Sequence, residues 1–177
     1  MLKILGGIVG VLVIAVVVLN FTLPDSFTVE REIVINKPVG MVFNELKFLK
    51  KHKAWDPWVK KDPNLKSDFK GDDGTVGFIA SWSGNEEVGV GEQEITNIVE
   101  GAKIETELRF KEPFENKGVA TFSTNPVSEN ETKVTWVMTG DSKFPMNIMC
   151  LFMSMDDMLG KEFEAGLSSM KQHFESM

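Results

Sequence analysis

Residues 145–177, at the carboxyl terminus, read PMNIMCLFMSMDDMLGKEFEAGLSSMKQHFESM. Apolar side chains recur there at the three- and four-residue spacing of one helical face. They are Ile148, Leu151, Phe152, Met155, Leu159, Phe163, Leu167, Met170 and Phe174. Pro145 suits a first helical turn, where its missing N–H leaves no bond unmade. The spacing predicts one continuous helix, which would reach about 45 Å at a rise of 1.5 Å per residue.

The chain before this helix, from about Leu65 to Gly140, consists of short runs separated by glycine, asparagine and serine turns. The clearest run is Lys103 to Lys111, in which apolar or threonine side chains alternate with charged ones. That alternation is typical of a strand with one dry face and one wet face. Six strands fit between the turns. Their short connections require antiparallel neighbours, because parallel neighbours need long crossovers.

A seventh strand is predicted at residues 27–36, where apolar and polar side chains alternate and Arg31 interrupts the inward row. Two short helices are predicted after it, one beginning at Pro38 and one around Trp55 to Trp58. A sheet with one dry face needs a cover, and only the C-terminal helix is long enough to lie across it. The predicted fold class is therefore α+β, with a curved seven-stranded antiparallel sheet around a long C-terminal helix.

The amino terminus adds one predicted transmembrane helix. Ile4 to Leu23 are 20 consecutive residues without a charge, enough to cross the roughly 30 Å hydrocarbon core of a bilayer. A cleaved signal peptide would need two small residues before the cleavage site, and residues 18–24 offer no such pair. We therefore expect a single-pass anchor at residues 1–23 and one domain at residues 24–177. Lys3, on the amino-terminal side, places that domain on the non-cytoplasmic side by the positive-inside rule.

The charge of the domain argues against nucleic acid as a partner. Lys3 is the one charged residue before Pro24, so residues 24–177 carry 18 basic and 26 acidic side chains, a net charge of −8. Such a surface repels a phosphate backbone. The single cysteine, Cys150, and the two histidines form no group with metal-ligand spacing, so no metal or other cofactor is expected. His52 lies among lysines, which predicts a solvated position.

The first half of the predicted C-terminal helix is more apolar than a sheet cover requires. Ten of the 14 residues from Met146 to Leu159 are apolar, and five of these are methionine. Methionine is flexible and polarisable, and it adapts to partners of variable shape. Three interpretations stay open: a methionine-rich core under a loop, the wall of a pocket for an apolar ligand, or a surface that docks on a membrane or a protein.

Seven short motifs follow one another along the chain from about Ser26 to Glu175. They are Ile33–Pro38 running into Val42-Phe43, Trp55-x-x-Trp58, Gly74–Gly77, Trp82–Asn85, Gly89–Ile95, Thr132–Trp136 and Glu162–Leu167. In this order they resemble the START-like, or SRPBCC, helix-grip superfamily, and within it the bacterial polyketide cyclase/dehydrase-like branch. The resemblance implies a deep, largely apolar cavity between helix and sheet. Such cavities serve lipids, hormones or polyketides, and in some branches catalysis.

Seven residues are candidates for ligand binding. Those expected to line the pocket are Trp82, Leu108, Phe110, Trp136, Met149 and Met153. The seventh, Arg31, could anchor a ligand oxygen or pair with a carboxylate of the protein, because a buried guanidinium demands a partner. Glu92 and Glu94 are the best acid–base candidates, although strand alternation alone leaves their direction open.

The leading hypothesis is a membrane-tethered binding or carrier domain for an apolar small molecule, lipid- or polyketide-like. One alternative is a cyclase or dehydratase that uses pocket carboxylates. It is the weaker hypothesis, because the chain has no tyrosine and no assured catalytic pair. The other alternative is an interaction module that presents the methionine-rich segment to a protein partner, which the sequence does not identify.

Overall fold

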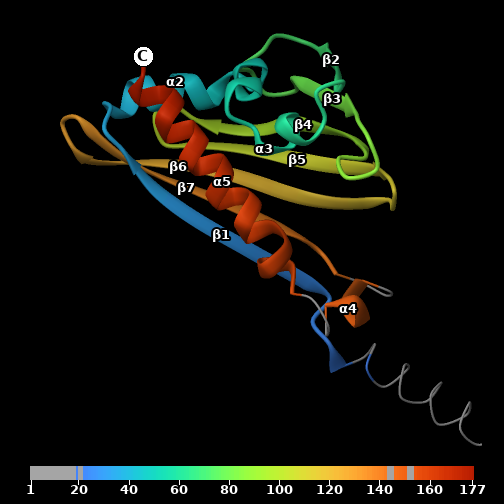
Figure 1. Cartoon of the computed structure of the whole chain (residues 1–177). Helices are drawn as coiled ribbons and strands as arrows, with labels where there is room; N and C mark the ends of the chain where they lie inside the picture. The colour runs from blue at the N-terminus through green and yellow to red at the C-terminus, as the bar shows by residue number, and fades with distance from the viewer. Residues whose placement is uncertain (1–18, 20–21, 143–145, 151–153) are drawn as a thin grey trace, which may run out of the picture.

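The computed structural model describes Leu19 and residues 22–142, 146–150 and 154–177 (Figure 1). Its strands are β1 (Ser26–Ile35), β2 (Lys66–Lys70), β3 (Ile79–Ser83), β4 (Val90–Val99), β5 (Lys103–Glu112), β6 (Asn116–Ser128) and β7 (Glu131–Asp141). Its helices are α2 (Val39–Lys47), the 3-10 helix η1 (Leu49–Ala54), α3 (Pro57–Lys61), α4 (Met146–Met149) and α5 (Met155–Glu175).

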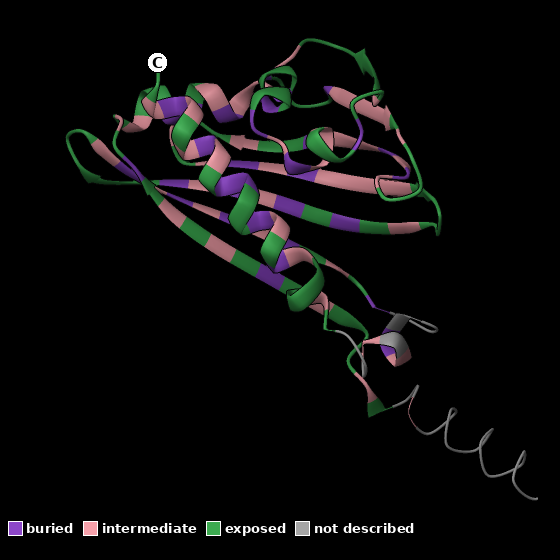
Figure 2. Ribbon diagram, viewed as in Figure 1, coloured by how far each residue is buried: buried purple, intermediate pink, exposed green. Residues whose placement is uncertain are grey.

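The predicted α+β architecture is confirmed. All seven strands form one antiparallel sheet in the order β1-β7-β6-β5-β4-β3-β2. The sheet curves around α5, which lies across β1, β7 and β6 (Figure 1). Burial alternates along the central strands, and one stripe of α5 is buried against them (Figure 2). The period-two pattern of the sequence therefore identified the face that α5 covers.

The predicted membrane span lies almost wholly outside the described residues. Of residues 4–23, the structure describes only Leu19, Thr22 and Leu23. Within the described part of the chain, no helix combines the length and apolarity that a bilayer crossing requires.

The continuous C-terminal helix predicted from Pro145 is wrong. The short helix α4 ends at Met149, and α5 begins only after Ser154, whose φ of −68° and ψ of 149° are extended. The Ser154 hydroxyl accepts a hydrogen bond from the Asp157 N–H at 3.0 Å, which caps the amino-terminal end of α5. Asp156 and Asp157 lie in the first turn, where the helix dipole favours negative charge. Figure 1 shows α4 off the axis of α5.

Aromatic side chains fill the middle of the space between α5 and the sheet. Trp136 on β7 stacks on Phe163 of α5, with ring centroids 4.0 Å apart and planes at 5°. Trp55 and Phe122 pack edge-on or tilted against Trp136. Trp136, Phe163 and their neighbours are almost completely buried. This part of the domain is therefore solid core.

The prediction that His52 is solvated is also wrong. Its side chain is buried against Trp55, with ring centroids 4.6 Å apart, and Nε2 donates to the Leu46 carbonyl at 2.7 Å. The lysines that flank it in sequence point elsewhere, because a 3-10 helix turns successive side chains in different directions. Burial lowers the pKa of His52 from 6.5 to about 4, since the charged imidazolium would lose its hydration.

Acid is therefore expected to destabilise the domain through His52. Below pH 6.5 His52 binds a proton in the unfolded chain, whereas in the folded chain it stays neutral until about pH 4. The free energy of unfolding should fall as the pH drops through this window. The total loss is about 3 kcal/mol, because each unit of pKa difference corresponds to roughly 1.4 kcal/mol. Urea unfolding at several pH values measures it. The difference between the native chain and His52→Gln isolates this histidine, and equal pH dependence in the two would refute the assignment.

Candidate ligand-binding site

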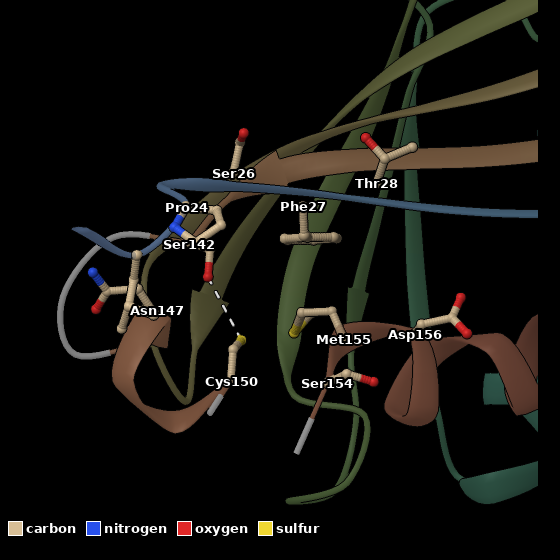
Figure 3. Close-up of a pocket in the computed structure, with 11 residues that line it drawn as sticks. Pro24, Ser26, Phe27, Thr28, Ser142, Asn147, Cys150, Ser154, Met155 and Asp156 are labelled. Carbon is tan, nitrogen blue, oxygen red and sulfur yellow. Dashed lines mark hydrogen bonds between the residues drawn. The ribbon is translucent and has the colours of Figure 1, made fainter. Parts of the chain in front are cut away.

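An open pocket of about 300 Å³ lies between the start of β1, the short helix α4 and the first turn of α5 (Figure 3). Its wall combines apolar and small polar residues. They are Leu23, Pro24, Ser26, Phe27, Thr28, Ser142, Asn147, Cys150, Ser154, Met155 and Asp156. Phe27 from β1 and Met155 from α5 point toward each other across it (Figure 3). The break between α4 and α5 creates this space, because α5 starts at Met155 and does not continue the line of α4.

The polar groups of the pocket are neutral except at its rim. The Ser142 hydroxyl and the Cys150 sulfur are 3.6 Å apart, a contact drawn in Figure 3. Ser142 donates its backbone N–H to the Asp25 carbonyl at 2.7 Å, which ties the end of β7 to the chain entering β1. Asp156 is the one charged residue among those lining the pocket. A ligand there would contact mainly carbon and sulfur, with hydroxyl groups available to orient it.

Arg31 connects this rim to the sheet. Its two terminal nitrogens, Nη1 and Nη2, donate to the Asp156 oxygens at 2.8 and 3.0 Å, and Nε donates to Glu164 at 2.8 Å. Gly160 makes the approach possible, because a Cβ there would lie 2.1 Å from Nη2. Arg31 thus donates mainly to carboxylates of α5, and Nη1 also donates to the Glu30 carbonyl at 2.8 Å. The arginine holds the first turns of the helix, and with them Met155, over β1.

These bonds determine the protonation of Asp156. Hydrogen bonding to Arg31 lowers the pKa of Asp156, and the same carboxylate is the main cause that raises the pKa of Arg31. Both groups are therefore charged at neutral pH. Asp156 is consequently an anion and not a proton donor, so the pocket offers no general acid from this residue.

Replacing Arg31 by methionine should raise the pKa of Asp156 toward its ordinary value of 3.8. The reason is that the guanidinium stabilises the ionised carboxylate. Carbon-13 NMR titration of the aspartate carboxyl groups in the full chain measures the change. Lys171→Met is the matched control, because Lys171 also lies on α5 but pairs with Glu175. An Asp156 pKa that is the same in the native chain and Arg31→Met would contradict the assignment.

The sequence-predicted aromatic candidates lie elsewhere on the inner face. Trp82 on β3 and Phe110 on β5 pack edge-to-face, with ring centroids 5.8 Å apart. Leu108 lies two residues along β5 on the same face, and all three are half-buried. Trp136 belongs to the core stack on Phe163. None of these four is among the residues that line the pocket.

The remaining predicted candidates divide into two groups. Arg31 reaches the pocket indirectly, through its bonds to Asp156. The Met149 side chain and all of Met153 lie outside the described residues. The sequence patterns did not predict this pocket, which joins β1, the end of β7 and the helix break. The sequence did contain a signal of the helix break. Ser154 followed by Asp157 is a pattern typical of a helix start, and it lies inside the apolar run.

The structure decides the direction of the two acid–base candidates. Glu92 and Glu94 lie on the opposite face of the sheet from Phe110, where both bind Arg109, at 2.8 and 2.9 Å. Lys111 and then Arg109 lower the pKa of Glu92. Neither carboxylate reaches the pocket. Among the described residues no cluster of three or more histidine, cysteine or acidic side chains has the arrangement of a metal site.

Comparison with known proteins finds similar solved structures. No family model matches the chain, and no curated protein matches it. Norcoclaurine synthase from Thalictrum flavum, solved in complex with dopamine and hydroxybenzaldehyde, is similar with a TM-score of 0.64 and 8% identity, over 88% of this chain and 90% of that one. The structure of Ara h 8.0201 is similar with a TM-score of 0.60 and 11% identity, over 86% of this chain and 99% of that one.

A third similar structure is ginseng major latex-like protein 151 from Panax ginseng, with a TM-score of 0.58 and 16% identity, over 85% of this chain and 99% of that one. Each of these likenesses extends over nearly the whole of the known chain. At such low identity they establish the architecture and leave the activity open. The chain therefore has the same fold as these three proteins.

Proposed function

We propose that this protein is a membrane-tethered domain that binds or carries an apolar small molecule. Residues 4–23 would form the single transmembrane anchor, and residues 24–177 would lie on the non-cytoplasmic side. The observation that carries the proposal is the position of the pocket, whose wall includes Leu23 and Pro24. Leu23 ends the uncharged segment and Pro24 follows it, so the pocket would open beside the bilayer.

The chemistry of the pocket favours a small apolar or aromatic ligand. A volume of about 300 Å³ is at the small end of the range for ligand pockets. Phe27, Met155 and Leu23 offer apolar surface, and burial of such surface contributes about 25 cal/mol per Å². The methionine can adapt to ligands of different shape. The norcoclaurine synthase complex, in which two small aromatic molecules are bound, supports the idea that this fold accommodates ligands of that size.

Binding is favoured over catalysis. Glu92 and Glu94 are held by Arg109 on the far face of the sheet, and Asp156 is held as an anion by Arg31. A cyclase or dehydratase would need a carboxylate free to exchange a proton with its substrate. Membership of the polyketide cyclase/dehydrase-like branch stays a prediction, and it would concern ancestry more than activity.

The test is ligand retention by the full chain, purified in maltoside micelles and examined by native mass spectrometry. Cys150→Phe fills the pocket, whereas Cys150→Ser removes the sulfur and leaves the space. The native chain and Cys150→Ser should carry an apolar molecule. Cys150→Phe should bind this molecule with about tenfold lower affinity, which corresponds to a loss of about 1.4 kcal/mol of binding free energy.

Near-ultraviolet circular dichroism confirms that each variant keeps the packed aromatic core. If the native chain carries no apolar molecule, or if folded Cys150→Phe retains as much as Cys150→Ser, the binding site is elsewhere or absent.

A further inference from the structure

We propose that the end of the sheet beside the pocket docks on a zwitterionic lipid surface, with Phe114 and Met158 inserted among the headgroups. This inference rests on the membrane anchor of the proposed function and adds the surface that faces the bilayer. The two side chains lie on different elements, the β5–β6 turn and the second turn of α5. They are 67% and 47% exposed.

The β5–β6 turn lies at the same end of the sheet as the start of β1, where the chain enters the domain. Asn116, which begins β6, donates its side-chain amide to the Asp141 carbonyl at 3.3 Å. Asp141 is in turn the register partner of Ser26, the first residue of β1. Phe114 is only two residues before Asn116, within about 7 Å at the reach of an extended chain. An anchor that ends at Leu23 would therefore bring Phe114 close to the membrane surface.

Met158 occupies the same end of the molecule. It follows Met155 by one helical turn, and Met155 lines the pocket. A phenylalanine that is 67% exposed gains little from the fold, because most of its apolar surface stays in water. At a membrane surface the same side chain is buried at the boundary between headgroups and acyl chains. Phe114, Met158 and the anchor would then form three points of contact around the mouth of the pocket.

The charge at this end of the domain favours zwitterionic over anionic lipid. Six exposed carboxylates surround this end of the domain, on the chain entering β1, the β5–β6 turn, the end of β7 and the start of α5. They are Asp25, Glu112, Glu115, Asp141, Asp156 and Asp157. Arg31 pairs with Asp156, and Lys111 and Lys117 lie on the strands that flank the turn, so these carboxylates outnumber the three cations by six to three. Anionic headgroups would be repelled, so the surface fits zwitterionic lipid.

The docked orientation gives the ligand a short path. The pocket opens between β1 and the first turn of α5, and both lie at the end that would face the headgroups (Figures 1 and 3). An apolar molecule leaving the bilayer would then enter the domain without crossing bulk water. The opposite end of the sheet, with the β6–β7 turn, would point away from the membrane (Figure 1).

The test compares two added tryptophans in the full chain, reconstituted in phosphatidylcholine vesicles with acyl chains brominated near the headgroup. Phe114→Trp probes the docking end. Val127→Trp is the matched control, because Val127 is 57% exposed at the far end of β6, about 40 Å away along the 13 residues of that strand. Bromine should quench most of the emission added by Phe114→Trp and none of that added by Val127→Trp. Equal quenching of the two would overturn the proposal.

Two further measurements separate the possible failures. Alkaline carbonate extraction reports whether residues 4–23 hold the chain in the vesicle. A chain that stays in the membrane while the two tryptophans are quenched equally would refute docking and leave the proposed function standing, whereas a chain released by carbonate refutes the tether on which both rest. Replacing part of the phosphatidylcholine by phosphatidylglycerol should reduce quenching of Phe114→Trp. Unchanged or stronger quenching would overturn the assignment to zwitterionic lipid.

Discussion

Replacing Phe163 by alanine should lower the free energy of unfolding by about 4 kcal/mol, within the 3–5 kcal/mol found for buried phenylalanine-to-alanine changes. Phe163 is completely buried and stacks on Trp136 at 4.0 Å. The ring also contacts Trp58 edge-on. Its loss would leave a cavity between α5 and the sheet that rigid aromatic neighbours fill poorly. The free energy of unfolding of a domain this size is about 5–15 kcal/mol in total, so about a quarter or more of its stability would be lost.

Urea unfolding of the full chain in maltoside micelles measures this effect, followed by far-ultraviolet circular dichroism. Met158→Ala is the control on the same helix, because Met158 is 47% exposed and should change stability by less than about 0.5 kcal/mol. The near-ultraviolet signal of Trp136 should weaken in Phe163→Ala alone. Equal losses in the two variants would mean that α5 is not held by this stack.

Gly89→Ala should cost a similar amount, about 4 kcal/mol, for a different reason. Gly89 has φ of +70°, which costs a residue with a Cβ roughly 1–2 kcal/mol. The added Cβ would also lie 2.3 Å from the Glu112 carbonyl oxygen, a backbone atom that cannot move without moving β5. Overpacking of this kind costs about 1–3 kcal/mol more. The glycine is required because two turns meet there.

Gly101→Ala separates the two causes. Gly101 has nearly the same φ, +73°, but a Cβ there would meet no atom within 4 Å. Gly101→Ala should therefore lower the free energy of unfolding only by the cost of the positive φ, about 1–2 kcal/mol. Thermal or urea unfolding of both variants tests the comparison. If Gly101→Ala is as destabilising as Gly89→Ala, the close approach to Glu112 contributes nothing.

The sheet could be predicted from the sequence because strand alternation is a local signal. The side chains of β5 alternate in sequence as they do in space, and turn residues mark where each strand ends. Gly89 makes a turn, and Gly91 in β4 lies against Trp82. The helix break was accessible in principle, since Ser154 and Asp157 have the spacing of a helix cap.

The site could not be predicted in the same way. Its wall joins Phe27, Ser142 and Met155, which are far apart in the chain and meet only when β1 pairs with β7 and α5 lies across them. Each of these residues looks like ordinary core or turn in its own segment. The pairing of Arg31 with Asp156 spans 125 residues and depends on the space left by Gly160. No local pattern contains that information.

The sequence by itself determined the fold class, the inner face of the sheet, the net charge and the uncharged stretch at residues 4–23, because each depends on the order or number of neighbouring residues. Tertiary structure alone decided which charges meet and which interior remains open. His52 shows the difference: its neighbours in sequence are lysines, whereas its neighbours in space are Trp55 and Phe122. Burial, pKa and pocket shape depend on neighbours in space, which packing brings together.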